Sequence, residues 1–172
     1  NTLTAIKGFA RYYEETGAGE LILIGDESDL NYATKCKKAA SKIGRGNQVQ
    51  FIGLASRESV VSELSKSWCL LHLSLEENAP MAISEALSLG VPVIASKVGG
   101  VCEMIIQGQN GILVDSPSDR EEILGAMLKI SDPEIRAQQS RVARKSAEIF
   151  DPKVVMRKHL EMYKAIMKEK KF

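Results

Sequence analysis

Five short apolar runs alternate with amphipathic segments along this chain, and the alternation constrains its fold more than any other feature. The runs cover residues 21–25, 49–53, 69–73, 91–95 and 111–114. Continuous apolar runs of this length are typical of strands buried on both faces of a parallel sheet. Helices between such strands form βαβ units. The pattern therefore predicts an α/β fold, with a Rossmann-like, mainly parallel sheet and helices on both faces.

The segments between the runs have helical periodicity. Helices are predicted near residues 3–13, 30–43, 60–68, 81–89 and 102–106, with extra C-terminal helices from residue 118 to about 168. We find no internal repeat or linker, so residues 1–172 are expected to form a single domain. Ligands of parallel sheets bind beyond the carboxyl ends of the strands, so residues that follow each run are the first candidates for a site.

Charge and composition argue against several other classes of protein. The 172 residues have a net charge of +1 and only 5% aromatic residues, which argues against a nucleic-acid partner. No apolar run approaches the length of a membrane-spanning helix, and the first residues do not resemble a signal peptide. Cys36, Cys69 and Cys102 are far apart and odd in number, which favours a reduced, cytoplasmic protein with inert, buried thiols.

Residues 74–111 contain the most informative pattern. Glu77 is expected in a loop after the third strand, and Glu85 in the second turn of a helix that begins near Pro80. The N–H groups of Met81 and Ala82 and the helix dipole would attract an anion. A carboxylate one turn further suits vicinal hydroxyls, so these parts fit a nucleoside diphosphate. The alternative is that both glutamates are solvated surface carboxylates.

The same stretch resembles the retaining GT-B glycosyltransferases of the family-4 type. Those enzymes have two glutamates eight positions apart, then an E-A-x-x-x-G-x-P-V block, a Gly-Gly turn, a Glu and an N-G-x-L-V segment. The matching residues are Glu77, Glu85, Ala86, Gly90, Pro92, Val93, Ile94, Ala95, Gly99, Gly100, Glu103, Asn110, Gly111, Ile112, Leu113 and Val114. The resemblance covers nearly the whole chain, as the C-terminal, donor-binding half of such an enzyme.

The resemblance implies a reaction and a set of roles. A sugar would pass, with retention, from a UDP-, GDP- or ADP-sugar donor to a hydroxyl acceptor, without a metal or other cofactor. Glu77 would be the catalytic glutamate near the donor sugar, and Glu85 would bind the ribose. The further donor-binding residues would be Gly25, Leu54, Ser74, Asn78, Ala79, Pro80, Met81 and Ala82.

The chain departs from the family pattern in two ways. Asn78 stands where the family usually has glycine after the first glutamate. The chain matches only the second half of the family's length, without the N-terminal acceptor domain and without the first, central strand. The resemblance therefore implies a fragment, inactive alone, whose partner is the missing N-terminal domain.

Other interpretations remain open at this stage. The chain could be a sugar-nucleotide epimerase of the same fold, a non-catalytic nucleotide-sugar-binding module, or a receiver-type domain. His72 is interpreted as a packed core residue. The last helix has two adjacent apolar stripes, which indicate either a contact with the N-terminal domain or a helix docked on its own sheet. Its basic end is compatible with a cytoplasmic protein that associates weakly with the membrane surface.

Overall fold

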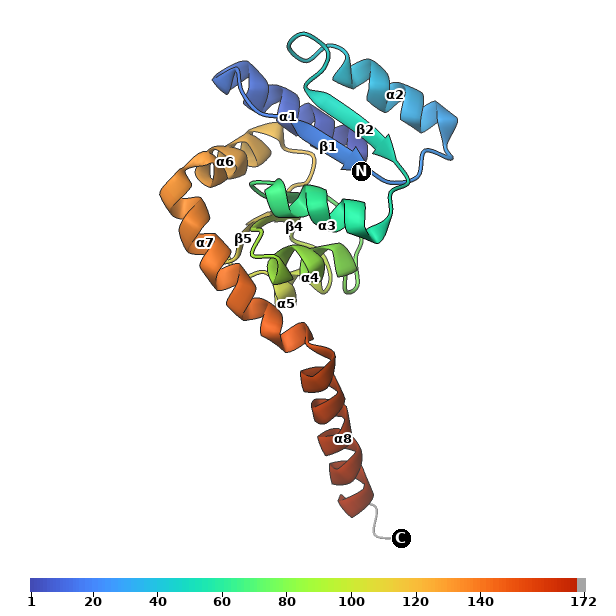
Figure 1. Ribbon diagram of the computed structural model, residues 1–172, viewed down its shortest axis with the longest axis vertical. Helices are drawn as coiled ribbons and strands as arrows, with labels where there is room; N and C mark the ends of the chain where they lie inside the picture. The colour runs from blue at the N-terminus through green and yellow to red at the C-terminus, as the bar shows by residue number, and fades with distance from the viewer. Residues whose placement is uncertain (170–172) are drawn as a thin grey trace.

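The computed structural model describes residues 1–169, and each of its strands is followed by a helix (Figure 1). The strands are β1 (Leu21–Ile24), β2 (Val49–Gly53), β3 (Leu70–His72), β4 (Val93–Ser96) and β5 (Gly111–Val114). The helices are α1 (Thr2–Thr16), α2 (Leu30–Ala40), α3 (Arg57–Lys66), α4 (Met81–Ser88), α5 (Val101–Met104), α6 (Arg120–Ser131), α7 (Pro133–Ser146), the 3-10 turn η1 (Ala147–Phe150) and α8 (Pro152–Glu169). The predicted α/β fold is confirmed.

All hydrogen-bonded strand pairs described within residues 1–169 are parallel, but the strands form two separate sheets. β1 pairs with β2, and β4 lies between β3 and β5 in the second sheet. The prediction of parallel strands is confirmed, and within residues 1–169 these strands are divided between two sheets. Since the strands of each sheet are parallel, their carboxyl ends lie at one edge of that sheet.

The second sheet has helices on both faces, as predicted. Along β4, Ile94 packs in a core with α1 and α6, whereas Val93 and Ala95 pack in a core with α4, α5 and α7. All three side chains are fully buried. Successive side chains of a strand point to opposite faces, so one short apolar strand holds both helical layers together.

Polar caps define where several helices begin. Asp29 accepts from the N–H of Tyr32 at the start of α2, and Asp132 caps α7 directly before Pro133. Such caps satisfy N–H groups that have no partner within the helix, and proline at the first helical position loses no bond. At the C-terminal end of α1, Gly17 adopts the left-handed conformation and ends the helix.

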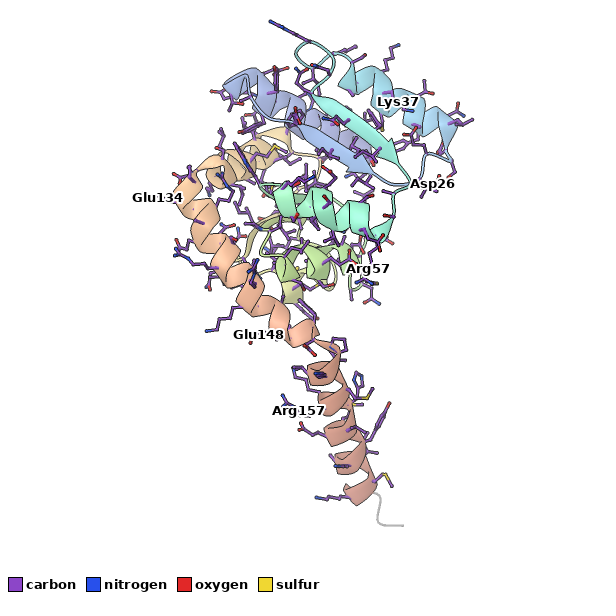
Figure 2. All side chains as sticks on the ribbon, in the orientation of Figure 1. Asp26, Lys37, Arg57, Glu134, Glu148 and Arg157 are labelled. Carbon is purple, nitrogen blue, oxygen red and sulfur yellow. The ribbon has the colours of Figure 1, made fainter. Side chains whose placement is uncertain are left out.

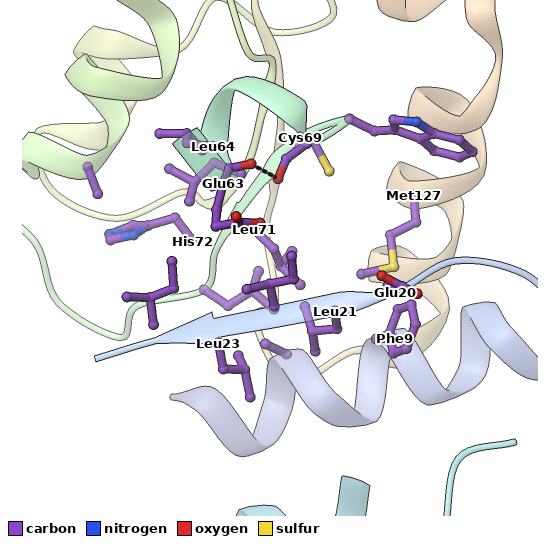
Figure 3. A pocket seen from close by; sticks show the side chains of 18 of the residues that line it. Phe9, Glu20, Leu21, Leu23, Glu63, Leu64, Cys69, Leu71, His72 and Met127 are labelled. Atoms are coloured by element: carbon purple, nitrogen blue, oxygen red, sulfur yellow. Dashed lines mark hydrogen bonds between the residues drawn. The ribbon is translucent and has the colours of Figure 1, made fainter. Parts of the chain in front are cut away.

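A cavity of about 960 Å³ separates the two sheets. Leu21 and Leu23 of β1 lie on one side of it, and Leu71 and His72 of β3 lie on the other (Figure 3). Within the described residues, β1 pairs with no strand except β2, and β3 with none except β4. The facing edges of β1 and β3 therefore have backbone N–H and C=O groups without strand partners.

Helix α8 extends away from the rest of the molecule and exposes its apolar side chains (Figures 1 and 2). The exposed large apolar residues of α8 are Val155, Met156, Leu160, Met162, Tyr163, Ile166 and Met167. The accessible surface of the chain, 10976 Å², exceeds the ~8,300 Å² that scaling gives for a compact 18.8 kDa protein. Of the two alternatives for this helix, docking on its own sheet is not what the structure shows.

The three thiols do not share one environment, so the expectation that all are buried is wrong for one of them. Cys36 is buried, and Cys69 is partly buried beside the cavity. Burial raises the pKa of the Cys69 thiol to about 12, so this group stays protonated. Cys102 is exposed on α5 because the short helix turns it away from the core that holds Val101.

Two helical glycines provide a test of the packing between α1 and α6. A Cβ at Gly8 would lie 2.6 Å from Cγ2 of the buried Ile123, whereas a Cβ at Gly125 would meet nothing within 4 Å. We expect Gly8→Ala to lower the free energy of unfolding by about 1 kcal/mol or more through overpacking. Gly125→Ala should raise it by about 0.5–1 kcal/mol through helix propensity. Urea unfolding measures both; stabilisation by both variants would contradict the close packing at Gly8.

Candidate functional site

Three polar side chains form a hydrogen-bonded cluster directly after β3. The hydroxyl of Ser74 donates to Oε1 of Glu77 at 2.7 Å, and Nε2 of His72 lies 2.8 Å from the same oxygen. Ser74 Oγ and His72 Nε2 are 3.1 Å apart. The side chains of His72 and Glu77 are 19% and 23% exposed, so both are largely shielded from solvent. The glutamate predicted to lie near a sugar is thus fixed by two neighbours.

These neighbours also favour the ionised form of Glu77. The hydrogen bond from Ser74 lowers the pKa of the Glu77 carboxyl most, and His72 lowers it further, while burial acts in the opposite direction. Glu77 is therefore a carboxylate at neutral pH, able to accept hydrogen bonds and unable to donate a proton.

The loop after Glu77 leads into the N-terminus of α4. Pro80 occupies the cap position without a side-chain cap, and its carbonyl accepts from the N–H of Ile83. Met81 and Ala82, the first residues of α4, direct their N–H groups out of the helix end. Met81 is 72% exposed, and Ala82 lines the cavity. The end of α4 therefore presents backbone donors and a positive dipole end toward the space beyond β3.

Glu85 lies one turn further along α4, where it lines the same cavity as Ser74 and Ala82. The side-chain hydrogen bonds on α4 come from Ser84 and Ser88, and none within residues 1–169 involves the Glu85 carboxylate. Two carboxylate oxygens without a protein partner can accept two hydrogen bonds from vicinal hydroxyls.

The Gly-Gly turn after β4 lies directly against the loop that holds Glu77. A Cβ at Gly99 would overlap the carbonyl oxygen of Glu77, and a Cβ at Gly100 would overlap that of Asn78. Only glycine lets two backbones approach so closely. The predicted Gly-Gly turn therefore sets the position of the loop after β3 through direct backbone contact.

Two predicted residues lie apart from this cluster. Gly25 follows β1, and its N–H donates to the carbonyl of Gly53 at 2.9 Å. Leu54, which directly follows Gly53, is 81% exposed. The cavity lining includes Ser74, Ala82 and Glu85 but neither Gly25 nor Leu54. The structure thus places the predicted residues in two groups, one at the carboxyl end of each sheet.

Some residues of the motif that resembles GT-B glycosyltransferases hold the fold together and lie away from the cavity. Asn110 is fully buried, and its Oδ1 accepts from the N–H of Ile106 at 2.7 Å. Its Nδ2 donates to the carbonyl of Met104 and to the hydroxyl of Ser146, so one side chain ties the turn before β5 to α7. A Cβ at Gly111 would overlap the carbonyl oxygen of Val93. These residues shape the β4–β5 region and make no contact with the cavity.

The role of His72 was not found from the sequence. The apolar run around it predicted a packed core residue, whereas the structure shows a half-buried imidazole bonded to Glu77. A histidine inside an apolar strand five residues before a glutamate is the one signal that could have indicated the pair.

Two further properties complete the description of residues 1–169. No group of three or more His, Cys, Asp or Glu side chains is placed to hold a metal ion in this part of the chain. None of its helices combines the length and the hydropathy that a membrane crossing requires.

Parallel strands alternating with helices, with polar groups gathered after β3, define the α/β class of fold that is typical of nucleotide-binding proteins. Comparison narrows the class to one family: the profile of glycosyl transferases group 1 matches residues 3–146. The chain belongs to this family. The resemblance to GT-B glycosyltransferases and the expected fold are thereby confirmed, while the roles of single residues remain predictions.

Similar proteins come from several bacteria. The chain is 35% identical over 106 residues to the Vi polysaccharide biosynthesis protein VipC/TviE of Salmonella typhi, covering 62% of this chain and 18% of that protein. It is 26% identical over 167 residues to N-acetyl-alpha-D-glucosaminyl L-malate synthase of Bacillus anthracis, covering 96% and 42%. Among solved structures, Anabaena Alr3699/HepE in complex with UDP has a TM-score of 0.82 at 23% identity, covering 94% and 44%. The chain spans less than half the length of each of these relatives.

The contact at Gly100 can be tested without backbone strain, because its φ of −70° suits alanine. We expect Gly100→Ala to push back the Asn78 backbone and to lower the free energy of unfolding by about 1–3 kcal/mol. Urea unfolding and the amide resonances of Glu77 and Asn78 measure the two effects. Gly125→Ala is the control; unchanged resonances in Gly100→Ala would contradict the contact.

The low pKa of Glu77 predicts a pH-dependent contribution to stability. Because the folded pKa lies below the usual value of 4.5, this contribution is present above that pH and is lost as the pH falls through the folded pKa. The wild-type chain should therefore lose more stability than Glu77→Gln between about pH 6 and about pH 3. Urea unfolding at both pH values checks this; equal losses would contradict it.

Proposed function

We propose that this chain is the donor-binding domain of a retaining glycosyltransferase, which transfers a sugar from a nucleoside diphosphate to a hydroxyl acceptor. One observation supports the proposal most strongly. The Glu85 carboxylate lines the cavity one turn from the open end of α4, and neither of its oxygens has a side-chain partner within residues 1–169. The helix end suits a diphosphate and the carboxylate suits a ribose.

Each proposed role follows from a separate position. Phosphate oxygens would accept from the N–H groups of Met81 and Ala82, which need no side chain for this purpose. Glu77, fixed and ionised, would accept from a sugar hydroxyl or stabilise positive charge that develops at the sugar. Asn78 and Ala79 are exposed in the loop between Glu77 and α4. The proposed reaction needs no metal or other cofactor.

The cavity between the sheets supports a second part of the proposal, on domain organisation. The strands at its two edges are β1, with four residues, and β3, with three, and each belongs to a parallel sheet. Apolar side chains line the cavity around them. An additional apolar strand between β1 and β3 would unite both sheets. Asn1 also lines the cavity, at the end where β1 finishes (Figure 1). We propose that a strand joined to Asn1 fills this space and that α8 contacts an acceptor-binding domain.

The cytoplasmic location and the weak association with a membrane surface remain predictions. Along α8, the basic side chains of Lys153, Arg157, Lys164 and Lys168 are exposed, as are the apolar ones. Figure 2 labels Arg157 on this helix. Cations of this kind favour anionic surfaces, but a solvated helix end has the same composition.

The donor site can be tested by calorimetric titration of the chain with UDP, GDP and ADP. We expect one nucleotide to bind and Glu85→Gln to weaken it by about tenfold, or ~1.4 kcal/mol, because the ribose loses its carboxylate. Glu76→Gln, an exposed glutamate of the same region, is the matched control and should bind as the wild type does. Absence of binding for all three nucleotides would contradict the proposed function.

A further inference from the structure

His72 is the one polar residue in an otherwise apolar strand, and the proposed function does not use it. Leu70, Leu71 and Leu73 surround it in sequence, and its imidazole is 19% exposed. Moving a polar ring out of water is unfavourable unless it finds a hydrogen-bond partner. Its partner is Glu77, 2.8 Å away, so the histidine is tied to the glutamate that faces the proposed sugar position.

The geometry fixes which atom of the carboxylate is occupied. The Ser74 hydroxyl donates to Oε1, and Nε2 of His72 contacts the same Oε1. An ionised carboxylate only accepts, so Nε2 must carry a hydrogen in this arrangement. Neither contact involves Oε2 of Glu77. Two donors on one oxygen therefore leave the other oxygen available, in a fixed orientation.

We propose that His72 and Ser74 are positioning residues, which hold Oε1 of Glu77 so that Oε2 alone accepts a hydroxyl of the donor sugar. The proposal rests on the proposed function and specifies how its sugar subsite is built. In this proposal both residues act through the Glu77 carboxylate and not on the nucleotide. Their effect is therefore on the affinity for the sugar part of the donor, separately from the affinity for the nucleoside diphosphate.

Other titratable groups lie near the cluster but do not replace this pair. The other titratable groups that line the cavity are the N-terminal amine of Asn1 and the side chains of Tyr12, Glu20, Glu63, Lys66, Cys69 and Glu85. Within residues 1–169, the side-chain hydrogen bonds of His72 reach only Ser74 and Glu77. The orientation of Glu77 thus depends on its two immediate neighbours.

The first test compares the dissociation constants of UDP and UDP-glucose, a donor found in a solved structure of the similar protein HepE. The ratio of the two constants reports the sugar contact. His72→Leu should reduce the gain from the sugar by about threefold or more, with the affinity for UDP unchanged. His72→Gln should retain most of the gain, because its amide N–H can reach the same oxygen. The matched control is His159→Leu, at the exposed histidine of α8.

The second test needs no nucleotide. Titration of the Glu77 carboxyl by NMR should show a higher pKa in Ser74→Ala and in His72→Leu than in the wild type, since each variant removes a donor. An unchanged Glu77 pKa, or UDP binding with the same sugar gain in His72→Leu, would overturn the positioning role. Absence of binding of UDP, GDP and ADP to the wild type would instead contradict the proposed function, so the two failures are distinct.

Discussion

The contact between two glycines and one loop determines the geometry on which the candidate site depends. Gly99 and Gly100 approach the backbone of Glu77 and Asn78 so closely that no side chain fits between them. The loops after β3 and β4 are therefore in direct backbone contact. Because α4 begins three residues after Asn78, the same backbone contact also sets the position of the N-terminus of α4. Backbone packing thus aligns a carboxylate with a helix dipole, and side chains only complete the arrangement.

No strand pairing connects the two sheets across the cavity within residues 1–169. β4 is paired on both sides and buried on both faces, whereas β1 and β3 each have one edge at the cavity. The helical layers bridge the division, since α1 contributes to the core beneath each sheet. The candidate site lies at the boundary: Ser74 and Glu85 belong to one side, and Gly25 follows the strand on the other.

Sequence reasoning predicted the elements well, because apolar periodicity and glycine stops are local signals. It also placed Glu77 in a loop and Glu85 inside α4, since the spacing of a motif along a helix start fixes both. It did not predict the bond between His72 and Glu77, which depends on how a loop folds back over a strand end. The exposure of Cys102 was missed for a related reason: a short helix directs one side chain outward irrespective of its hydropathy.

Helix α8 also affects how the molecule moves in water. Its 18 residues form a rod of about 27 Å at the standard rise per residue. The rod projects from one end of the body, as Figure 1 shows, so the particle is elongated. An elongated particle tumbles and sediments more slowly than a sphere of equal mass. A single copy of the chain should therefore have a larger hydrodynamic radius than a compact globular protein of the same mass.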